Sequence, residues 1–356
     1  MQVCSPLVLG IETSCDDTAC AVVDGEGGVL ASAVSSQLAA HRPYGGVVPE
    51  IASREHLRNW LPVAEEALAR AGVAMAQVDA VAATRGPGLV GCLLVGLSLG
   101  RAIAWSLARP FLAVHHLEGH LYSPFLRESG EPAEAPPGRF LGLVVSGGHT
   151  TLFEAADGGV ATLAETRDDA MGEVFDKVGK RLGLPYPQGP QVDALAERGK
   201  EGSFRFAVPR MGDGSLDFSY SGLKSEALRG IERLEAAGVA TDLAAVDEPP
   251  AEVLDLLAGF RRAAVAQLLD RLERVRRERD VPLLAASGGV AANRLLRREL
   301  EGWSQAGSVP LRLVPLRYAG DNAAMIAHAG LLRLRRGDTD DPLAATAASR
   351  IPLGAG

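Results

Sequence analysis

Apolar and polar positions are grouped along the chain in a pattern that predicts both strands and helices. Two segments share one plan, in which an apolar run is followed by a turn of small or acidic residues and by a second apolar run. They are LVLGIETSCDDTACAVVD, which ends at Asp24, and LGLVVSGGHTTLFEAAD, which spans residues 141–157. Each is typical of a strand–turn–strand hairpin. Two such hairpins in successive halves of the chain predict a duplicated architecture with one hairpin in each lobe.

Helical periodicity separates these hairpins. Apolar residues recur at helical spacing over residues 53–71 and 251–279, and each helix is expected to cover a sheet. The segment VPLLAASGGVAANRLLRREL predicts a buried strand, a turn at Gly288 and Gly289, and a helix from about Ala291. These alternating elements predict an α/β protein.

The uncharged run from Gly86 to Gly100 predicts a buried helix. Arg101 and Arg109 interrupt it before it could cross a bilayer of about 30 Å, so no membrane span is expected. Its glycines would let the helix pack closely against a sheet.

The length of 356 residues fits two domains of ordinary size. Residues 127–139, RESGEPAEAPPGR, are rich in Pro, Gly and Glu without periodicity, and they are the expected linker between the lobes.

Composition narrows the class of protein. A hydrophobic content of 47% with 22% charged residues is typical of a soluble globular protein. The net charge of −8 does not indicate a nucleic-acid partner, although local arginine clusters permit one. The chain has four cysteines without C-x-x-C spacing, and its first apolar run lacks a basic flank. A reducing, cytoplasmic setting is therefore expected.

The stretch HHLEGH contains a candidate metal pair. His116 and His120 are four residues apart, so on a helix they project from one face. The protease pattern H-E-x-x-H fails because Leu117 follows His116, while Glu118 falls on the opposite face. An isolated pair of this kind is also compatible with two ordinary polar helix residues, since a metal needs further ligands.

Two glycine pairs follow predicted strands. Ser146-Gly147-Gly148 and Ser287-Gly288-Gly289 could leave backbone N–H groups free to bind phosphate oxygens, although glycine turns also occur for steric reasons alone. Asp16 and Asp17, in the first hairpin, could position a metal, water or substrate amine, or could simply form the turn.

Further carboxylates stand near predicted turns and helix ends. Asp176, on a short helix, and Asp193, after a proline-rich loop around Gly189, could accept hydrogen bonds from ribose hydroxyls. Asp321, ahead of an alanine-rich helix, is either a helix N-cap or a third metal ligand beside the two histidines.

Taken together, these segments resemble the TsaD family, once called glycoprotease Gcp, over nearly the whole chain. The matching motifs, in the family's order, are GIETSCDDTACAVVD, YGGVVPEIASREH, RGPGLVGCLLVGLSLGRA, HHLEGH, VVSGGHT, DDAMGEVFDKVGKRLG, FSYSGLKS, SGGVAANRLL and DNAAMIAHAG. Three positions in two loops depart from the family pattern. Gln188 replaces a usual glycine, and Ala319-Gly320 replaces a common Cys-Thr pair, which puts only local loop geometry in doubt.

The resemblance implies the actin, sugar-kinase and heat-shock-seventy (ASKHA) fold, with two α/β lobes around a nucleotide cleft. Residues 1–130 with 321–356 would form the N-terminal lobe and residues 131–320 the C-terminal lobe. The implied activity is tRNA N6-adenosine threonylcarbamoyl transfer, from threonylcarbamoyl-AMP to the adenosine 3′-adjacent to the anticodon in tRNAs reading ANN codons. A TsaB-like paralogue and a TsaE-like ATPase are the implied protein partners.

The resemblance also implies residue roles. His116, His120 and Asp321 would hold one metal ion, with Fe(2+) expected and Zn(2+) as the alternative. The implied adenylate-binding residues are Val144, Val145, Ser146, Gly147, Gly148, Asp176, Gly189, Asp193 and Asn293.

The exocyclic amine of adenine is a poor nucleophile, so the carbamoyl carbonyl must be polarised, which a metal with open positions can do. We expect Glu12 or Asp16 to accept the amine proton. The alternatives are a small-molecule kinase of the same fold, a metallopeptidase, and a nucleotide-binding scaffold. The histidine pair speaks against the kinase and the scaffold, and the missing glutamate at position 117 speaks against the peptidase.

Overall fold

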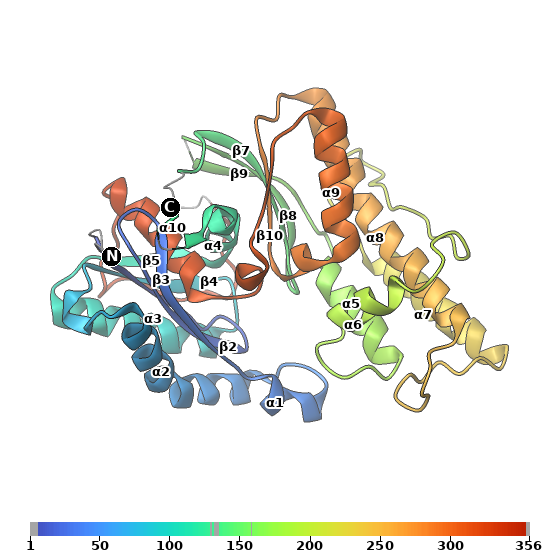
Figure 1. Cartoon of the computed structure of the whole chain (residues 1–356), viewed down its shortest axis with the longest axis horizontal. Helices are drawn as coiled ribbons and strands as arrows, with labels where there is room; N and C mark the ends of the chain where they lie inside the picture. The colour runs from blue at the N-terminus through green and yellow to red at the C-terminus, as the bar shows by residue number, and fades with distance from the viewer. Residues whose placement is uncertain (1–5, 129, 132–134, 158, 354–356) are drawn as a thin grey trace. The chain divides into compact units, whose positions relative to one another are not determined.

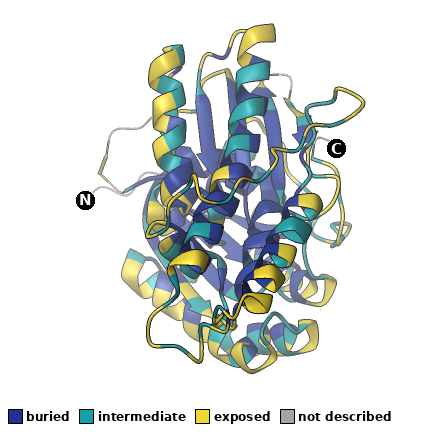
Figure 2. Cartoon of the chain, turned by 90° about the vertical axis from the view of Figure 1, so that its right-hand side faces the viewer, coloured by how far each residue is buried: buried dark blue, intermediate teal, exposed yellow. Residues whose placement is uncertain are grey.

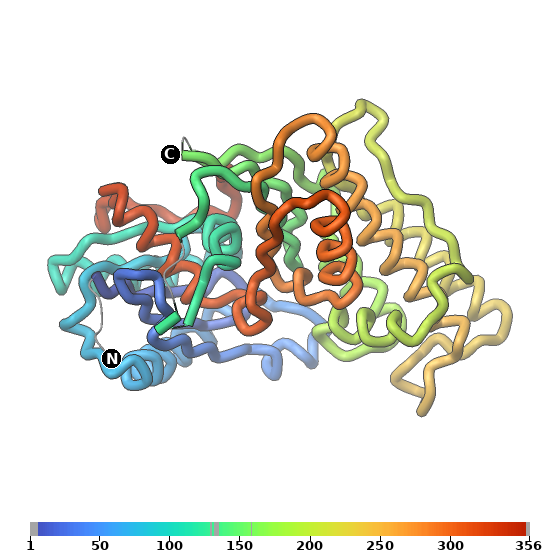
Figure 3. Tube along the Cα trace, turned by 45° about the horizontal axis from the view of Figure 1, so that its top comes forward, coloured from blue at the N-terminus to red at the C-terminus, as the bar shows by residue number. Residues whose placement is uncertain are grey.

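The computed structural model describes residues 6–128, 130–131, 135–157 and 159–353, so Cys4 and part of the expected linker lie outside the described residues. The chain divides into two compact units, one of residues 1–137 with 314–356 and the other of residues 138–313. Figure 3 shows how the C-terminal segment returns to the N-terminal one within the first unit. The expected linker contains the first junction between the units, although Arg127–Glu128 at its start form a short strand.

The first unit is a six-stranded mixed sheet covered by helices (Figure 1). Its strands are β1 Val8–Glu12, β2 Asp17–Val23, β3 Gly28–Ser36, β4 Ala80–Gly86, β5 Phe111–His115 and β6 Arg127–Glu128, in the order β5-β4-β1-β2-β3-β6. Its α-helices are α1 Leu38–His41, α2 Pro49–Ala71, α3 Val90–Leu107, α4 His116–Tyr122 and α10 Ala323–Arg335. The first predicted hairpin is confirmed, since β1 and β2 pair antiparallel.

Strand β1 is buried on both faces because helices cover both sides of the sheet. Leu9 and Ile11 pack into a cluster with residues of α2 and α3, while Gly10, which points the other way, faces α10. A Cβ at Gly10 would clash with the Ala323 carbonyl oxygen. Glycine at this position therefore lets the start of α10 lie directly against the strand that ends at Glu12.

Helix α3 corrects one expectation. It begins at Val90 rather than Gly86, which belongs to β4, and it is not buried all round: Leu93 and Leu97 are in the core, whereas Leu94 is 50% exposed. Among the described residues it is the one helix long and apolar enough to cross a membrane by length and composition. Gly96 and Gly100 lie against Ile11 and other strand residues, as their close-packing role predicts.

The second unit is a five-stranded mixed sheet with long helices packed on it. Its strands are β7 Arg139–Val145, β8 Thr150–Ala156, β9 Gly159–Glu165, β10 Leu284–Ser287 and β11 Leu311–Leu313, in the order β11-β10-β7-β8-β9. Its α-helices are α5 Met171–Arg181, α6 Gly189–Ala196, α7 Ser221–Ala236, α8 Ala251–Glu278 and α9 Arg294–Gly307. In Figure 2 the strands are buried, and the exposed residues lie on the outer faces of helices and in loops.

The second unit confirms the second hairpin and adjusts the helix after the glycine pair. Strands β7 and β8 pair antiparallel, as predicted. Helix α9 starts at Arg294 rather than near Ala291, because Gly289–Ala292 form a 3-10 turn and Asn293 caps the helix by accepting from the Leu296 N–H at 2.9 Å. The cap side chain, rather than the glycines, fixes the start of the helix.

Candidate functional site

Three parallel strands end at one edge of the first sheet. Strands β5, β4 and β1 are neighbours with parallel pairing, so their carboxyl ends lie side by side. These ends carry Glu12 on β1, Thr84 on β4, and His115, after which His116 begins α4. Residues far apart in the sequence therefore meet at the edge where α/β sheets usually bind ligands.

His116, His120 and Asp321 converge at this edge. The nearest carboxylate oxygen of Asp321, Oδ1, lies 3.1 Å from Nε2 of His120 and 3.6 Å from Nε2 of His116. One ligand atom from each residue lies within 4.8 Å of the others. The two histidine rings are edge to face at 4.7 Å between centroids, as expected for neighbours one helical turn apart.

A glycine on α4 brings the pair close to Asp321. A Cβ at Gly119 would come within 2.8 Å of Ile326 on α10, so α4 and α10 pack closely at this point. Asp321 directly precedes the capping residue of α10 and is therefore carried to His120 by this packing.

Glu12 holds the first histidine from behind. Its buried carboxylate accepts from the Thr84 hydroxyl at 2.8 Å and the Ser14 N–H at 2.5 Å, and it lies 2.9 Å from Nδ1 of His116. Because an ionised carboxylate only accepts, Nδ1 carries the proton, and Nε2 of a neutral His116 presents its lone pair toward Asp321. Sequence reasoning missed this contact, because Glu12 closes β1 while HHLEGH follows β5, and β4 lies between these two strands.

Two neighbouring residues have structural roles that separate them from the cluster. His115 caps α4 by accepting from the Leu117 N–H at 3.1 Å. Asn322, not Asp321, caps α10 by accepting from the Met325 N–H at 2.9 Å, so the N-cap explanation of Asp321 is wrong. Because Asn322 provides the cap, the Asp321 carboxylate is not needed in that role and can face the histidines.

The electrostatics of the cluster favour a positive charge. Burial would lower the pKa of His116, but the carboxylates of Asp321 and Glu12 raise it to about 9. Glu118 takes no part, since it lies 3.9 Å from Arg336 on the far side of α4. Two imidazoles and the Asp321 carboxylate therefore face one point where a cation would be stabilised, and Glu12 adds negative charge from the far side of His116.

The donor set fits a divalent transition metal. Ligands bound at about 2.1 Å to one ion lie roughly 3.0–3.5 Å apart, close to the spacing of the Asp321 oxygen from the two nitrogens. A metal-bound histidine usually donates its other N–H to a carboxylate, as His116 does to Glu12. Imidazole and carboxylate suit iron and zinc equally well.

The turn that carries Asp16 lies beside the cluster. The Ser14 hydroxyl is 3.3 Å from Nδ1 of His116, and the Cys15 carbonyl lies 3.1 Å from Nε2 of the buried His56. Asp17 begins β2, where burial, followed by the charge of Asp16, raises its pKa to about 7. The turn is thus tied to the fold at residues that flank Asp16.

The two Ser-Gly-Gly turns are neighbours in the second unit. Strands β7 and β10 pair parallel, with Ser287 opposite Val144, so both turns leave the same sheet edge. Gly147 and Gly148 are exposed, and a Cβ on either would meet nothing within 4 Å. Val144 and Val145 are fully buried in the sheet, so their side chains cannot reach a ligand directly.

Asp176 braces the proline-rich loop. Its Oδ1 accepts from the N–H groups of Gln188, at 3.1 Å, and Gly189, at 2.7 Å. These bonds hold the start of α6 against α5. Gln188, which departs from the family pattern, is buried, and its N–H still donates to Asp176.

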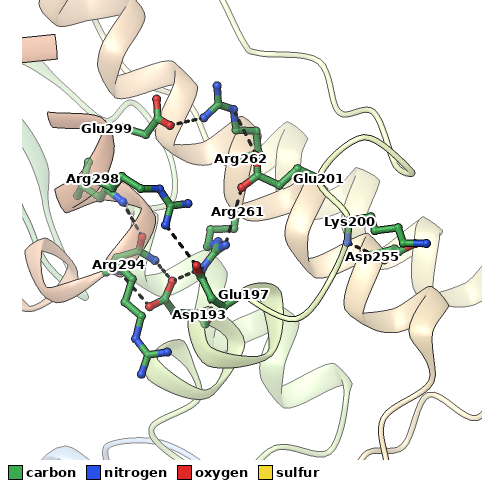
Figure 4. Close-up of polar contacts among 12 residues, drawn as sticks. Asp193, Glu197, Lys200, Glu201, Asp255, Arg261, Arg262, Arg294, Arg298 and Glu299 are labelled. Carbon is green, nitrogen blue, oxygen red and sulfur yellow. Dashed lines mark hydrogen bonds and ion pairs between the residues drawn. The ribbon is translucent and has the colours of Figure 1, made fainter. Parts of the chain in front are cut away.

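Asp193 lies in a charged network with Arg261 and Arg294 (Figure 4), and it also contacts Asn293. Asn293 Nδ2 donates to Asp193 Oδ1 at 2.7 Å, and the Arg294 N–H donates to Oδ2 at 3.2 Å. The buried Arg261 adds a third donor at 3.0 Å. The structure therefore brings these two predicted residues together beside the Ser287-Gly288-Gly289 turn.

Comparison with protein families and known sequences identifies close relatives. Residues 28–328 match the family profile TsaD, described as tRNA N6-adenosine threonylcarbamoyltransferase. The chain is 47% identical over 336 residues to the tRNA N6-adenosine threonylcarbamoyltransferase of Pelobacter propionicus, covering 94% of each chain. It is 48% identical over 331 residues to the protein of that name in Burkholderia mallei, covering 93% of each.

Solved structures resemble the fold with little sequence identity. HypF of T. kodakarensis matches with a TM-score of 0.58 and 16% identity, over 93% of this chain and 48% of that one. Component A of (R)-2-hydroxyglutaryl-CoA dehydratase from Acidaminococcus fermentans matches with a TM-score of 0.51 and 16% identity, over 93% and 99% of the two chains. These matches concern the fold alone, and they confirm the expected α/β architecture of the ASKHA class.

Proposed function

The chain belongs to the TsaD family of tRNA N6-adenosine threonylcarbamoyltransferases, and from this premise we propose how its residues carry out the transfer. The enzyme is an acyltransferase that forms threonylcarbamoyladenosine in tRNA. The proposed donor is threonylcarbamoyl-AMP, and the proposed acceptor is N6 of the adenosine 3′-adjacent to the anticodon in tRNAs reading ANN codons. The observation that carries the proposal is the convergence of His116, His120 and Asp321.

These three residues are proposed to hold one metal ion, Fe(2+) in the first instance and Zn(2+) as the alternative. When bound, such an ion supplies Lewis acidity toward the carbamoyl or phosphate oxygens of the donor. Nε2 of each histidine and Oδ1 of Asp321 are the proposed ligand atoms, since these atoms face one another.

The chain's own residues set the geometry for the reaction. Glu12 is buried and accepts three hydrogen bonds, which supports a role in orienting His116 over the proton-accepting role expected from the sequence. Asp16, half-buried on the turn beside the cluster, is then the remaining candidate for accepting the proton of the adenine amine.

The adenylate is proposed to bind the second unit. The exposed amides of Gly147 and Gly148 would donate to phosphate or carbamoyl oxygens. The backbone at Val144 and Val145 and the hydroxyl of Ser146 would support that turn. Asp193, Asn293, Asp176 and Gly189 would shape the nucleoside side, with Asp176 and Asn293 acting through the loops they brace.

A single-turnover assay tests the assignment. Purified protein is mixed with threonylcarbamoyl-AMP made from radiolabelled threonine, and with tRNA that carries adenosine or guanosine 3′ to the anticodon. Label should enter only the adenosine-containing tRNA, and H116A, H120A and D321A should each abolish it. Transfer by all three variants at the wild-type rate would refute the assignment of the cluster.

The alternatives from the sequence are less well supported. A metallopeptidase base is missing, because Glu118 lies beside Arg336 on the far side of α4. A kinase of this fold would not need the histidine pair.

We propose that the enzyme works in the cytoplasm with a TsaB-like paralogue and a TsaE-like ATPase. An apolar surface supports a protein partner: Leu57 and Leu61 on α2 are 67% and 61% exposed, and Val90 and Leu94 on α3 are 45% and 50% exposed. Gly91 lies against Ser53, so the four side chains flank one helix contact. Replacing Leu57 and Leu94 by aspartate should abolish co-purification of the paralogue.

A further inference from the structure

Arg261, on α8, is a buried arginine at the centre of the network in Figure 4. The residue is 1% exposed. Its Nη1 donates to Asp193 Oδ1 at 3.0 Å, to the Asp193 carbonyl oxygen at 3.1 Å and to Glu197 Oε2 at 2.6 Å. One guanidinium nitrogen therefore contacts both the backbone and the side chain of Asp193.

Stability alone is a poor explanation for this arrangement. Removing Arg261 and the Asp193 carboxylate from water is costly, and buried ion pairs can often be replaced by apolar residues without loss of stability. The Nε of Arg261 is also buried without a hydrogen-bond partner among the described residues. Because one buried polar atom of this network has no partner in the described part of the chain, a role in positioning neighbouring residues explains the network better than stabilisation does.

Arg261 holds a chain of contacts that ends at the second glycine turn. Asp193 Oδ1, fixed by Arg261, accepts from Asn293 Nδ2 at 2.7 Å. The Oδ1 of Asn293 in turn caps α9 through the Leu296 N–H. Helix α6 is thereby fixed against the segment that joins Ser287-Gly288-Gly289 to α9.

The contacts also leave the two carboxylate oxygens of Asp193 unequal. Oδ1 accepts from two side chains, Arg261 and Asn293. Within the part of the chain that the structure describes, Oδ2 accepts only from the Arg294 N–H, at the longer distance of 3.2 Å. Oδ2 is therefore the oxygen with remaining capacity for a ligand hydroxyl.

We propose that Arg261 is a positioning residue for adenylate binding: it orients Asp193 so that Oδ2 is available to the nucleoside, and it fixes the Asn293 segment through the same carboxylate. The proposal rests on the proposed adenylate-binding role of Asp193 and Asn293. Arg261 itself does not touch the ligand.

The test compares R261M and R261K with R262M, a matched control on the same helix. Arg262 is 45% exposed in its side chain and pairs with Glu299 at 2.6 Å, so its charge is not needed at Asp193. Each variant is assayed for the KM of threonylcarbamoyl-AMP, the KM of tRNA and the Ki of AMP, after folding is checked by circular dichroism.

We expect R261M to raise the KM of the adenylate and the Ki of AMP by ~10-fold or more, because it removes a charged hydrogen bond that orients Asp193. The KM of tRNA should stay within about twofold, as should every constant of R262M. R261K should be intermediate, since lysine keeps the charge but not the guanidinium geometry.

A folded R261M with unchanged KM and Ki would overturn the proposal, and so would failure of both Arg261 variants to fold, which would assign the residue to stability. D193N separates the two levels of the argument. If D193N weakens adenylate binding while R261M does not, only the role of Arg261 is wrong. If D193N has no effect, the proposed adenylate site is wrong as well.

Discussion

Nδ1 of His116 donates to Oε2 of Glu12 across 2.9 Å, and this contact determines what each side chain can do. The carboxylate fixes the protonated nitrogen of the ring on the side away from Asp321, so Nε2 is left as the metal-facing atom. Glu12, in turn, is saturated by His116, Thr84 and Ser14, and it is removed from direct contact with a substrate amine.

The first prediction concerns E12Q. The amide cannot accept from all three donors, so the orientation of His116 should loosen, and metal affinity should fall by about 10–100-fold. Isothermal titration with Zn(2+) measures this without reference to activity. E118Q is the control, because Glu118 lies on the same helix as the histidines but beside Arg336, and it should bind metal as the wild type does. Equal affinity of E12Q and E118Q would contradict the positioning role.

The second prediction separates Asp321 from its neighbour. D321A should lose metal binding, and well above pH 9, where His116 is neutral, it should change the unfolding free energy of the metal-free protein little, because Asp321 caps no helix. N322A should lose about 1 kcal/mol of stability, since Asn322 accepts from the Met325 N–H. Urea denaturation with chelator present gives the stability, and titration gives the affinity. The reverse pattern would restore the explanation of Asp321 as a cap.

Much of the fold follows from local pattern. The two hairpins could be predicted because β1–β2 and β7–β8 are sequential strands with polar turns between them. The α3 boundaries could not, because Gly86 still belongs to β4, where it pairs with His115 of β5 after a shift in register, and the apolar run hides the change from strand to helix. The exposed face of α3 could not be predicted either, because the run is apolar on every side.

The candidate site was only partly readable from the sequence. The spacing of His116 and His120 indicates a shared face, but only the parallel order β5-β4-β1 brings His116 to Glu12 and Thr84. Either Asp321 or Asn322 could serve as a cap by residue type. The choice depends on where α10 begins against Gly10, which is a tertiary contact.

The third prediction concerns metal removal. Dialysis against a chelator should reduce single-turnover transfer by roughly 10²-fold or more, and one equivalent of Fe(2+) or Zn(2+) should restore it. Inhibition by AMP should persist in the metal-free protein, because its proposed contacts lie in residues 138–313 and the metal ligands do not. Full transfer by protein that contains well under one metal ion per chain would contradict the proposed cofactor.

The last prediction uses His328, a buried residue of α10 whose ring nitrogens have no partner among the described residues. Burial, with smaller contributions from Arg335 and Arg127, lowers its pKa from 6.5 to about 4. Below pH 6.5 the unfolded chain therefore takes up a proton that the folded chain does not, so stability should fall as the pH decreases from 6.5 to 4.

H328L removes this group and should flatten the decline in the unfolding free energy, measured by urea denaturation at pH 7.5, 5.5 and 4.5. H149L is the control, since His149 is only half-buried, and it should retain the wild-type slope. Identical slopes for H328L and the wild type would show that His328 does not contribute to the acid sensitivity of the fold.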